Sequence, residues 1–433
     1  MKINILKFEK VIFYLILLFL PTQIGKHFWP DFSMVLGIRV DYLSPTLYFT
    51  DVLILILFIL TLAKSKFSIF NFQFLMKSKF KNFNIKNSFQ ISNFKFQISL
   101  FMIFLITGIL MSKSPVLGLY GLLKIIEFGF FGFYTANYLR GKTQSIYGLI
   151  TICFVIGIFF ESLLGIAHYL NQGSIGGILY FFGEREFSQS TPGIANASIN
   201  GELMLRPYGT FPHPNVLAGY LVIAMAITIS NIKYQISNIK KTFYFSAFII
   251  GTIALFLTMS RVAILIWILF LFAKIYSAFK YKFLSLLTLF GFLSIILLSP
   301  LSQRFINVSP MDQSVQLRKE LVQISFTMIK RNPLFGVGLN NFLVNTASYL
   351  QPVHDIYLLI AAQIGIVGLL MFLWFIGKTF KKIKNQKSKI KNFKFITLSI
   401  ILILGLFDHY FLTIQQGQLL FSFILGLCWR GKK

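Results

Sequence analysis

The sequence is poor in charged residues and in cysteine. Charged side chains make up 12% of the 433 residues, while 56% of the residues are hydrophobic. Soluble domains usually carry about 25% charged residues. The two cysteines, Cys153 and Cys428, both fall in apolar segments, which excludes a disulfide framework or a thiolate metal site. This composition excludes an ordinary globular domain and a disordered chain, and it is typical of an all-α polytopic membrane protein.

Long apolar runs divide the chain. A helix needs about 20 apolar residues to cross the hydrocarbon core of a bilayer, and by this measure the sequence predicts about 12 transmembrane helices. The first run follows Lys2, Lys7 and Lys10 and could also be a signal peptide. No small-residue cleavage site follows it, so we interpret it as an anchor. The predicted spans are 10–25, 46–63, 97–112, 117–138, 146–170, 213–230, 242–259, 262–279, 283–300, 354–377, 395–411 and 413–430.

Acidic residues are scarce relative to basic ones. The chain has 13 Asp and Glu against 41 Lys and Arg, for a net charge of +28. In a soluble protein this excess would suggest nucleic acid. Here, if the N-terminus is cytoplasmic, 29 of the 41 basic residues fall in cytoplasmic segments. The positive-inside rule therefore predicts cytoplasmic N- and C-termini in a multi-pass protein of the plasma membrane, with lipids rather than nucleic acid as partners.

The loops of this single membrane domain, 1–433, differ in character. The cytoplasmic basic loop 64–96 alternates Lys, Asn and Phe, and we interpret it as a linker lying on anionic headgroups, with RNA binding as the alternative. The external loops 171–212 and 301–353 are the long ones, so we expect chemistry there. The second loop contains a predicted amphipathic helix at about 314–330, which Asn332 and Pro333 end.

One candidate motif ends the first external loop. It reads Arg-Pro-Tyr-Gly-Thr-Phe-Pro-His-Pro-Asn from Arg206 to Asn215. Pro214 suits the first turn of a helix, where its missing N–H costs nothing, so part of the motif is a helix start. This explanation does not account for Arg206, and we treat Arg206, His213 and Asn215 as candidate site residues.

Two predicted outer turns carry further polar residues. Ser260 and Arg261 lie in a short turn between two predicted helices. An arginine at a membrane boundary either reaches lipid phosphate or captures a substrate phosphate with its planar fork of donors. Asp408 and His409 lie in the turn before the last predicted helix and could border the same site.

A third motif opens the tenth predicted helix. From His354, Gly365 and Gly368 are 11 and 14 residues away, close to three and four helical turns. The spacing predicts that the histidine and both glycines share one helix face, where the glycines allow helix packing. His354 would then face a protein-lined space, although a structural role is the alternative. Asp355 is expected to complement the dipole of the first helical turn.

Other polar residues lie within predicted helices. Lys124 and Glu127 are three residues apart and can neutralise each other. Glu161 and His168 are seven residues apart on one helix face. They could form a proton relay or a buried structural pair, and the relay would suit a transporter.

Taken together, these motifs resemble the O-antigen ligase and O-antigen polymerase family of integral membrane glycosyltransferases. The resemblance spans about residues 200–376. The segment 354–368 resembles the ligase signature of His, then Asn, Ser or Gln, nine residues, Gly, two residues and Gly, from which Asp355 departs. Arg206 and Arg261 are similar to the two essential arginines of the family. The stretch 332–338, which we interpret as a turn, is similar to its large-loop motif.

The resemblance implies glycan transfer at the external membrane face, in the assembly of cell-surface polysaccharide. The donor would be a glycan on a polyprenyl (undecaprenyl) diphosphate, and the acceptor a hydroxyl of a glycolipid, glycan or protein. Arg206 and Arg261 would stabilise the leaving diphosphate, while His354 would act as the base or bind phosphate as imidazolium. We expect substrate contacts also from His213, Asn215 and Asp355, and an inverting reaction that uses no cofactor or metal.

Two sets of alternatives stay open. A ligase, a repeat-unit polymerase and a protein O-oligosaccharyltransferase share this apparatus and differ in acceptor. A transporter or flippase for lipid-linked sugars belongs to another class and is motivated by Glu161 and His168. The sequence lacks the paired broken helices expected of inverted-repeat transporters.

Overall fold

The structure of the chain is a computed structural model. It describes residues 2–64, 101–141, 144–199, 201–232, 238–278, 313–346, 348–386 and 391–430, with the single positions 99, 290, 291 and 294. The predicted helix at 283–300 and the basic loop at 64–96 lie almost entirely outside these residues.

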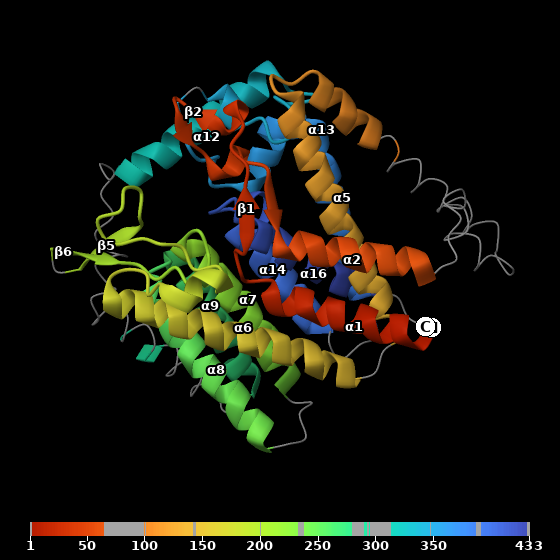
Figure 1. The fold of residues 1–433 in the computed structure, drawn as a ribbon, viewed down its shortest axis with the longest axis vertical. Coiled ribbons are helices and arrows are strands. Elements are labelled where there is room, and N and C mark those ends of the chain that lie inside the picture. The colour runs from red at the N-terminus through yellow and green to blue at the C-terminus, as the bar shows by residue number, and fades with distance from the viewer. Residues whose placement is uncertain are drawn as a thin grey trace, which may run out of the picture.

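Helices dominate the described residues, and three two-stranded antiparallel sheets lie in the connections between them (Figure 1). The strands are β1 (Gly25–His27) paired with β4 (Thr46–Tyr48), β2 (Met34–Val35) with β3 (Ile38–Arg39), and β5 (Asn196–Ile199) with β6 (Glu202–Leu205). The helices are α1 (Lys2–Phe19), α2 (Phe49–Lys64), α5 (Pro115–Tyr138), α6 (Gln144–Asn171), α7 (Pro214–Ile232), α8 (Asn238–Leu257), α9 (Arg261–Ala278), α12 (Gln313–Arg331), α13 (Ile356–Lys384), α14 (Lys391–Leu404), α15 (Tyr410–Thr413) and α16 (Gln415–Trp429).

Among the described residues, three helices are long and apolar enough to cross a membrane. They are Pro115–Tyr138, Ile146–Asn171 and Ile356–Lys384, and shorter apolar helices occupy Phe101–Leu110, Pro214–Ser230, Lys241–Leu257 and Asn392–Leu404. The chain is thus an integral membrane protein. The total of twelve crossings and the side of each terminus stay predictions.

Two helices end earlier than the apolar runs suggest. α1 stops at Phe19 rather than near residue 25, because Thr22 turns the chain and donates both its N–H and its hydroxyl to the Phe19 carbonyl. α14 stops at Leu404 rather than near residue 411, and residues 405–407 form a turn. The second difference places Asp408 and His409 in the connection between α14 and α15.

α7 lies at the centre of the helical bundle. All of its residues from Val216 to Thr228 are buried, and it packs against α6, α8, α9 and α14 (Figure 1). A helix that is apolar all round needs neighbours on every side, which explains this central position. The packing fixes Asn215 in the first turn of α7.

A buried ionic cluster joins α2, α5 and α16. The Lys124 ammonium lies 2.6 Å from Asp51, 3.0 Å from Glu127 and 3.3 Å from the Gln415 side-chain oxygen. The expected neutralisation of Lys124 by Glu127 is therefore present, and Asp51 adds a second carboxylate. Burial of these charges is tolerated because each has partners.

α13 is not a continuous helix. Ile364 and Gly365 leave helical geometry, and Gly365 has a φ of 73° and a ψ of 175°, a conformation open to glycine almost alone. His354 precedes α13, whose N-cap is Asp355. The prediction that His354, Gly365 and Gly368 share one helix face is therefore wrong, because the face requires an unbroken helix.

The turn at 332–338 fills the break in α13. The N–H groups of Val337 and Gly338 donate to the carbonyls of Ala362 and Gln363, each at 2.9 Å, and the Ile366 N–H donates to the Pro333 carbonyl at 2.8 Å. These bonds satisfy backbone groups that the break leaves without helical partners, as a membrane interior requires.

The glycines of the third motif have local roles. A Cβ at Gly365 would overlap the Leu334 carbonyl, and one at Gly368 would overlap the Ile364 side chain. The atoms nearest to these two positions belong to the turn and to α13 itself, and the helix packing expected at Gly365 and Gly368 stays a prediction. Gly365 admits the 332–338 turn, and Gly368 admits a side chain of its own helix.

Glu161 and His168 anchor the loop 171–212 to α6 instead of pairing with each other. Glu161 accepts hydrogen bonds from the N–H and the hydroxyl of Thr210, at 2.8 and 2.7 Å. The His168 ring lies 2.8 Å from Glu184, which also accepts N–H groups from the start of the loop. The structure thus accounts for both residues as loop anchors, which removes the observation that motivated a transporter.

Candidate active site

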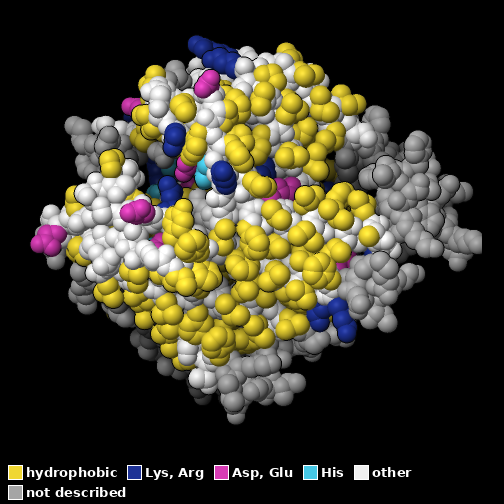
Figure 2. All heavy atoms as spheres, in the orientation of Figure 1, with side chains coloured by type: hydrophobic (Ala, Val, Ile, Leu, Met, Phe, Trp, Pro, Cys, Tyr) yellow, Lys and Arg dark blue, Asp and Glu magenta, His cyan; other side chains and the backbone are white. Residues whose placement is uncertain are grey.

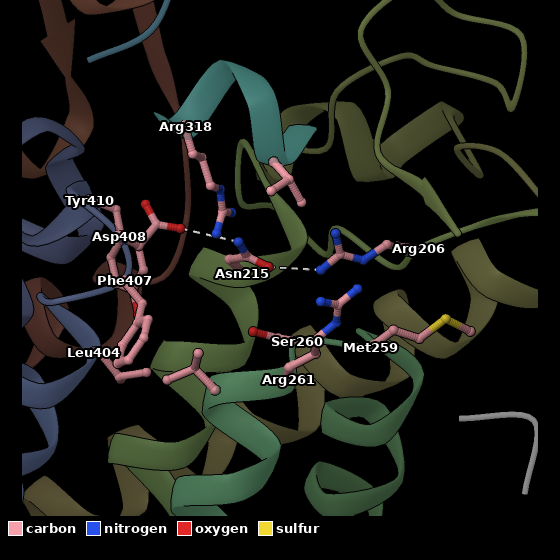
Figure 3. A pocket seen from close by; sticks show the side chains of 12 residues that line it. Arg206, Asn215, Met259, Ser260, Arg261, Arg318, Leu404, Phe407, Asp408 and Tyr410 are labelled. Carbon is pink, nitrogen blue, oxygen red and sulfur yellow. Dashed lines mark hydrogen bonds between the residues drawn. The ribbon is translucent and has the colours of Figure 1, made fainter. Parts of the chain in front are cut away.

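A cavity of about 290 Å³ lies where the first turns of α7 and α9 meet α12 and the turn after α14 (Figure 3). We call it the arginine cavity. Figure 2 shows basic, acidic and histidine side chains gathered in a hollow of an otherwise largely apolar face. The cavity is lined by Arg206, Asn215, Met259, Ser260, Arg261, Val262, Val315, Arg318, Leu404, Phe407, Asp408 and Tyr410.

Arg206 is held rigidly in the wall of the cavity. It follows strand β6, and its side chain is buried. Its Nε donates to the Thr258 carbonyl at 2.7 Å, and one terminal nitrogen donates to the Asn215 side-chain oxygen at 2.7 Å. The Thr258 carbonyl is available because α8 ends at Leu257, directly before it. These two bonds fix the position of the Arg206 guanidinium in the wall of the cavity.

Arg261 approaches the same cavity from α9. The turn between α8 and α9 consists of residues 258–260, and Arg261 is the first residue of the new helix. The Ser260 carbonyl accepts the Ile264 N–H at 2.9 Å, which closes the first turn. A helix N-terminus carries partial positive charge, and the arginine adds a full one. This part of the cavity therefore favours an anion.

Arg318 was not among the predicted site residues. It extends from α12 toward the cavity, opposite Arg261 (Figure 3). The signal was present in the sequence, because Val315 and Val322, three residues before and four after it, place Arg318 on an apolar stripe of the helix. Arg318 itself is exposed, and its side chain reaches the cavity from the edge of this stripe.

Asp408 is the single carboxylate among the lining residues. One of its oxygens accepts the His409 N–H at 2.8 Å, and the other accepts the Asn215 side-chain amide at 3.1 Å. Burial alone would raise the pKa of Asp408, but His409, His354 and His213 and the Asn215 hydrogen bond hold it below its usual value. Three guanidinium groups thus face one ionised carboxylate.

His354 lies beside the arginine cavity, although it does not line it. Its ring centroid is 5.1 Å from that of His409. Burial lowers the pKa of His354, Asp408 opposes this effect, and Arg318 reinforces it. The imidazole is therefore neutral at neutral pH, as a base must be. Its Nδ1 is buried without a hydrogen-bond partner in the described part of the chain.

Two further histidines are kept neutral. Burial and the nearby Arg206 lower the pKa of His213 to about 3, and its Nδ1 accepts the Asn215 N–H at 3.1 Å. Burial also lowers the pKa of His409 to about 3, and its Nδ1 lies 2.7 Å from the Thr413 hydroxyl. Both rings are occupied by local bonds, which suits a positioning role better than proton transfer.

One set of side chains has the spacing of a metal site. Ligand atoms of His354, Asp408 and His409 lie within 4.8 Å of one another. Both Asp408 oxygens already accept hydrogen bonds, and the charge of Arg318 acts on both histidines. This positive environment opposes a divalent cation. The expectation of a reaction without metal or cofactor stays a prediction.

The remaining predicted site residue, Asp355, has a structural task. Its carboxylate accepts the N–H groups of Tyr357 and Leu358, at 2.7 and 2.8 Å, and so caps α13. Capping accounts for its charge at the start of the helix. Asp355 thereby fixes the neighbouring His354 at the end of the loop.

Comparisons with known proteins bear on this arrangement. Residues 246–373 match the family model described as O-Antigen ligase, and a comparison with curated proteins gives no match. The matched segment carries Arg261, Arg318 and His354, whereas Arg206 and Asn215 precede it. Residues 246–373 of this integral membrane protein therefore belong to the O-antigen ligase family, whose members are glycosyltransferase-like enzymes of polysaccharide assembly.

Proposed function

We propose that this protein transfers a glycan from a polyprenyl diphosphate carrier, such as undecaprenyl diphosphate, to an acceptor hydroxyl at the external membrane face. The observation that carries the proposal is the arginine cavity, in which Arg206, Arg261 and Arg318 face a single carboxylate, Asp408. A lipid diphosphate is an anion held at headgroup level, and guanidinium groups match the geometry of phosphate oxygens.

The reaction is a single displacement. The acceptor oxygen forms a bond to the anomeric carbon while the bond from that carbon to the diphosphate oxygen breaks, and the electron pair leaves with the diphosphate. The leaving group gains one negative charge in this step, so Arg206 and Arg261 stabilise the transition state more than the bound donor. Attack opposite the leaving group inverts the anomeric carbon.

His354 receives the proton of the acceptor hydroxyl. Its neutral ring is the form that accepts a proton, and its position beside Asp408 places it at the edge of the arginine cavity. The imidazolium formed during the reaction is stabilised by the Asp408 carboxylate, because the two ligand atoms lie within 4.8 Å. Asp408 itself remains ionised.

The positions of the other histidines support this division of roles. His213 and His409 have their Nδ1 atoms engaged by Asn215 and Thr413, whereas Nδ1 of His354 has no partner in the described part of the chain. A base needs a ring that local hydrogen bonds do not already fix in one task.

The test is a transfer assay with a defined donor. Purified full-length protein in proteoliposomes receives a polyprenyl-diphosphate oligosaccharide together with a glycolipid or protein acceptor, and mass spectrometry identifies the product. A longer lipid-linked chain identifies a polymerase, while a new glycolipid or glycoprotein identifies a ligase or a protein O-oligosaccharyltransferase. Movement of intact donor across the bilayer with no new glycosidic bond would instead identify a flippase and overturn the proposal.

A further inference from the structure

We propose that a second cavity, at the C-terminal end of α13, binds the headgroup of an anionic phospholipid. The cavity is lined by Phe380, Lys381, Ile383, Lys384, Asn385, Asn392, Phe395 and Ile396, and its volume is about 740 Å³. We call it the lysine cavity. It lies between α13 and α14 and shares no lining residue with the arginine cavity.

The lysine cavity lies at the level of a membrane surface. α13 is a candidate membrane span of 29 residues, Ile356–Lys384. At 1.5 Å per residue the two helical parts on either side of the break at Gly365 are together at most roughly 40 Å long, which is about the thickness of a bilayer with its headgroups. The arginine cavity lies near the first end of this span and the lysine cavity at the other. The lysine cavity is therefore at the headgroup level of the opposite leaflet.

The lining of the lysine cavity has a polar part and an apolar part, which match the headgroup and the acyl chains of a phospholipid. Lys381, Lys384, Asn385 and Asn392 provide charged and amide donors for phosphate oxygens. The remaining lining side chains are apolar, and Phe380 and Phe395 pack with ring centroids 5.1 Å apart. A soluble phosphate would use only the donors, whereas a phospholipid would also cover the apolar wall with the start of its acyl chains.

The sequence around the lysine cavity contains many basic residues and no acidic ones. Eight lysines and no acidic residue lie between Asp355 and Asp408. The lysines of this segment that lie close to the cavity differ in their surroundings. Lys378 lies over the Trp374 ring and Lys382 over the Trp429 ring, while buried Lys394 donates to Gln386 at 2.8 Å. Lys381 and Lys384 are exposed and line the cavity, so they are the lysines placed to receive a lipid phosphate.

These differences provide a matched control. The double variant K381Q/K384Q removes two charges from the cavity, and K378Q/K382Q removes two charges from the same helix outside it. K381R/K384R keeps the charge at the cavity. All four positions lie in the last turns of α13, so the variants change the same element. A melting curve of each purified protein reports whether it is folded.

Native mass spectrometry of the full-length protein measures the retention of phosphatidylglycerol relative to phosphatidylcholine. We expect wild type and K381R/K384R to prefer phosphatidylglycerol. In K381Q/K384Q we expect this preference to be about 25-fold weaker, because each lysine near an anionic surface contributes about fivefold. We expect K378Q/K382Q to retain it.

Three results would overturn the proposal. The first is a wild type with no preference for phosphatidylglycerol. The second is an equal loss in both glutamine variants, which would indicate bulk charge rather than a cavity. The third is full displacement of the lipid by inorganic phosphate at equal concentration, which would identify a soluble phosphate as the ligand. None of these results depends on the glycan transfer activity.

Discussion

Arg206 donates to the Asn215 side-chain oxygen at 2.7 Å, and both residues line the arginine cavity together with its one carboxylate, Asp408. The Asn215 amide nitrogen donates in turn to Asp408 at 3.1 Å (Figure 3). The amide between them orients both the guanidinium and the carboxylate.

The Asn215 bridge predicts a large effect of a nearly isosteric change. N215L removes both hydrogen bonds, so Arg206 loses its orientation, and we expect transfer to fall about 100-fold, the scale of a 1 Å misplacement. The effect should appear in kcat and in donor KM together. N137L is the control, because Asn137 is exposed on α5 and bonds only within its own helix in the described structure. Equal activity of N215L and wild type would contradict the bridge.

Replacement of Arg318 tests whether the third guanidinium of the arginine cavity binds the donor. R318Q removes one donor group from an exposed position, and we expect the donor to bind about tenfold more weakly, or ~1.4 kcal/mol. The control is K319Q, which makes the same charge change one residue along α12, outside the lining. Binding of a fluorescent polyprenyl diphosphate is the measurement. Equal weakening by both variants would mean that long-range charge, and not a contact, attracts the donor.

His354 should be required for the chemical step but not for donor binding. H354A removes the base, and we expect kcat to fall by about 10²- to 10⁴-fold while the Kd of the donor changes little. H27A is the control, because His27 lies in β1 and is stacked on Trp29. A loss of donor affinity with little change in kcat would assign His354 to phosphate binding instead.

The pH dependence distinguishes the two roles of His354 independently. Because burial lowers its pKa from 6.5, opposed by Asp408 and reinforced by Arg318, the neutral ring persists below the pH at which a free imidazole protonates. We therefore expect kcat/KM to be constant from about pH 8 to pH 6.5 and to fall at lower pH. Asp408 stays ionised over this range, since its pKa is also lowered. A rate that rises on acidification would indicate imidazolium.

Replacement of Gly365 tests whether the break in α13 requires glycine. G365A places a side chain at a φ of 73° and against the Leu334 carbonyl, and we expect a loss of at least about 2 kcal/mol of stability. G377A is a control on the same helix, where a Cβ would meet open space, and alanine should stabilise the helix by about 0.5–1 kcal/mol. Thermal unfolding in detergent measures both. Similar melting temperatures for the two variants would show that the turn at 332–338 tolerates displacement.

Much of the arginine cavity could be predicted from local sequence. Arg206, Asn215 and Arg261 each lie at a helix or strand end that proline or apolar periodicity indicates, and ends of helices gather at membrane surfaces. Arg318 was visible in principle as a charge on an apolar stripe. The Asn215 bridge was not, because it depends on a contact with Asp408, 193 residues away.

The conformation of α13 shows where periodicity fails. The spacing of His354, Gly365 and Gly368 suggested a single face because a constant 3.6-residue period was assumed. The structure breaks that period at Gly365, and the freed carbonyls bind the turn at 332–338. Such a partner, distant in sequence, has no signature within the helix itself. His354 lies near the cavity through the cap at Asp355 rather than through the helix face.

The most direct test of the account is an experimental structure of the full-length protein with a bound polyprenyl diphosphate. We predict density for the diphosphate in the arginine cavity, within hydrogen-bonding distance of Arg206 and Arg261, and with the polyprenyl chain directed toward lipid. Density in another part of the molecule, or guanidinium groups turned away from the diphosphate, would contradict the account.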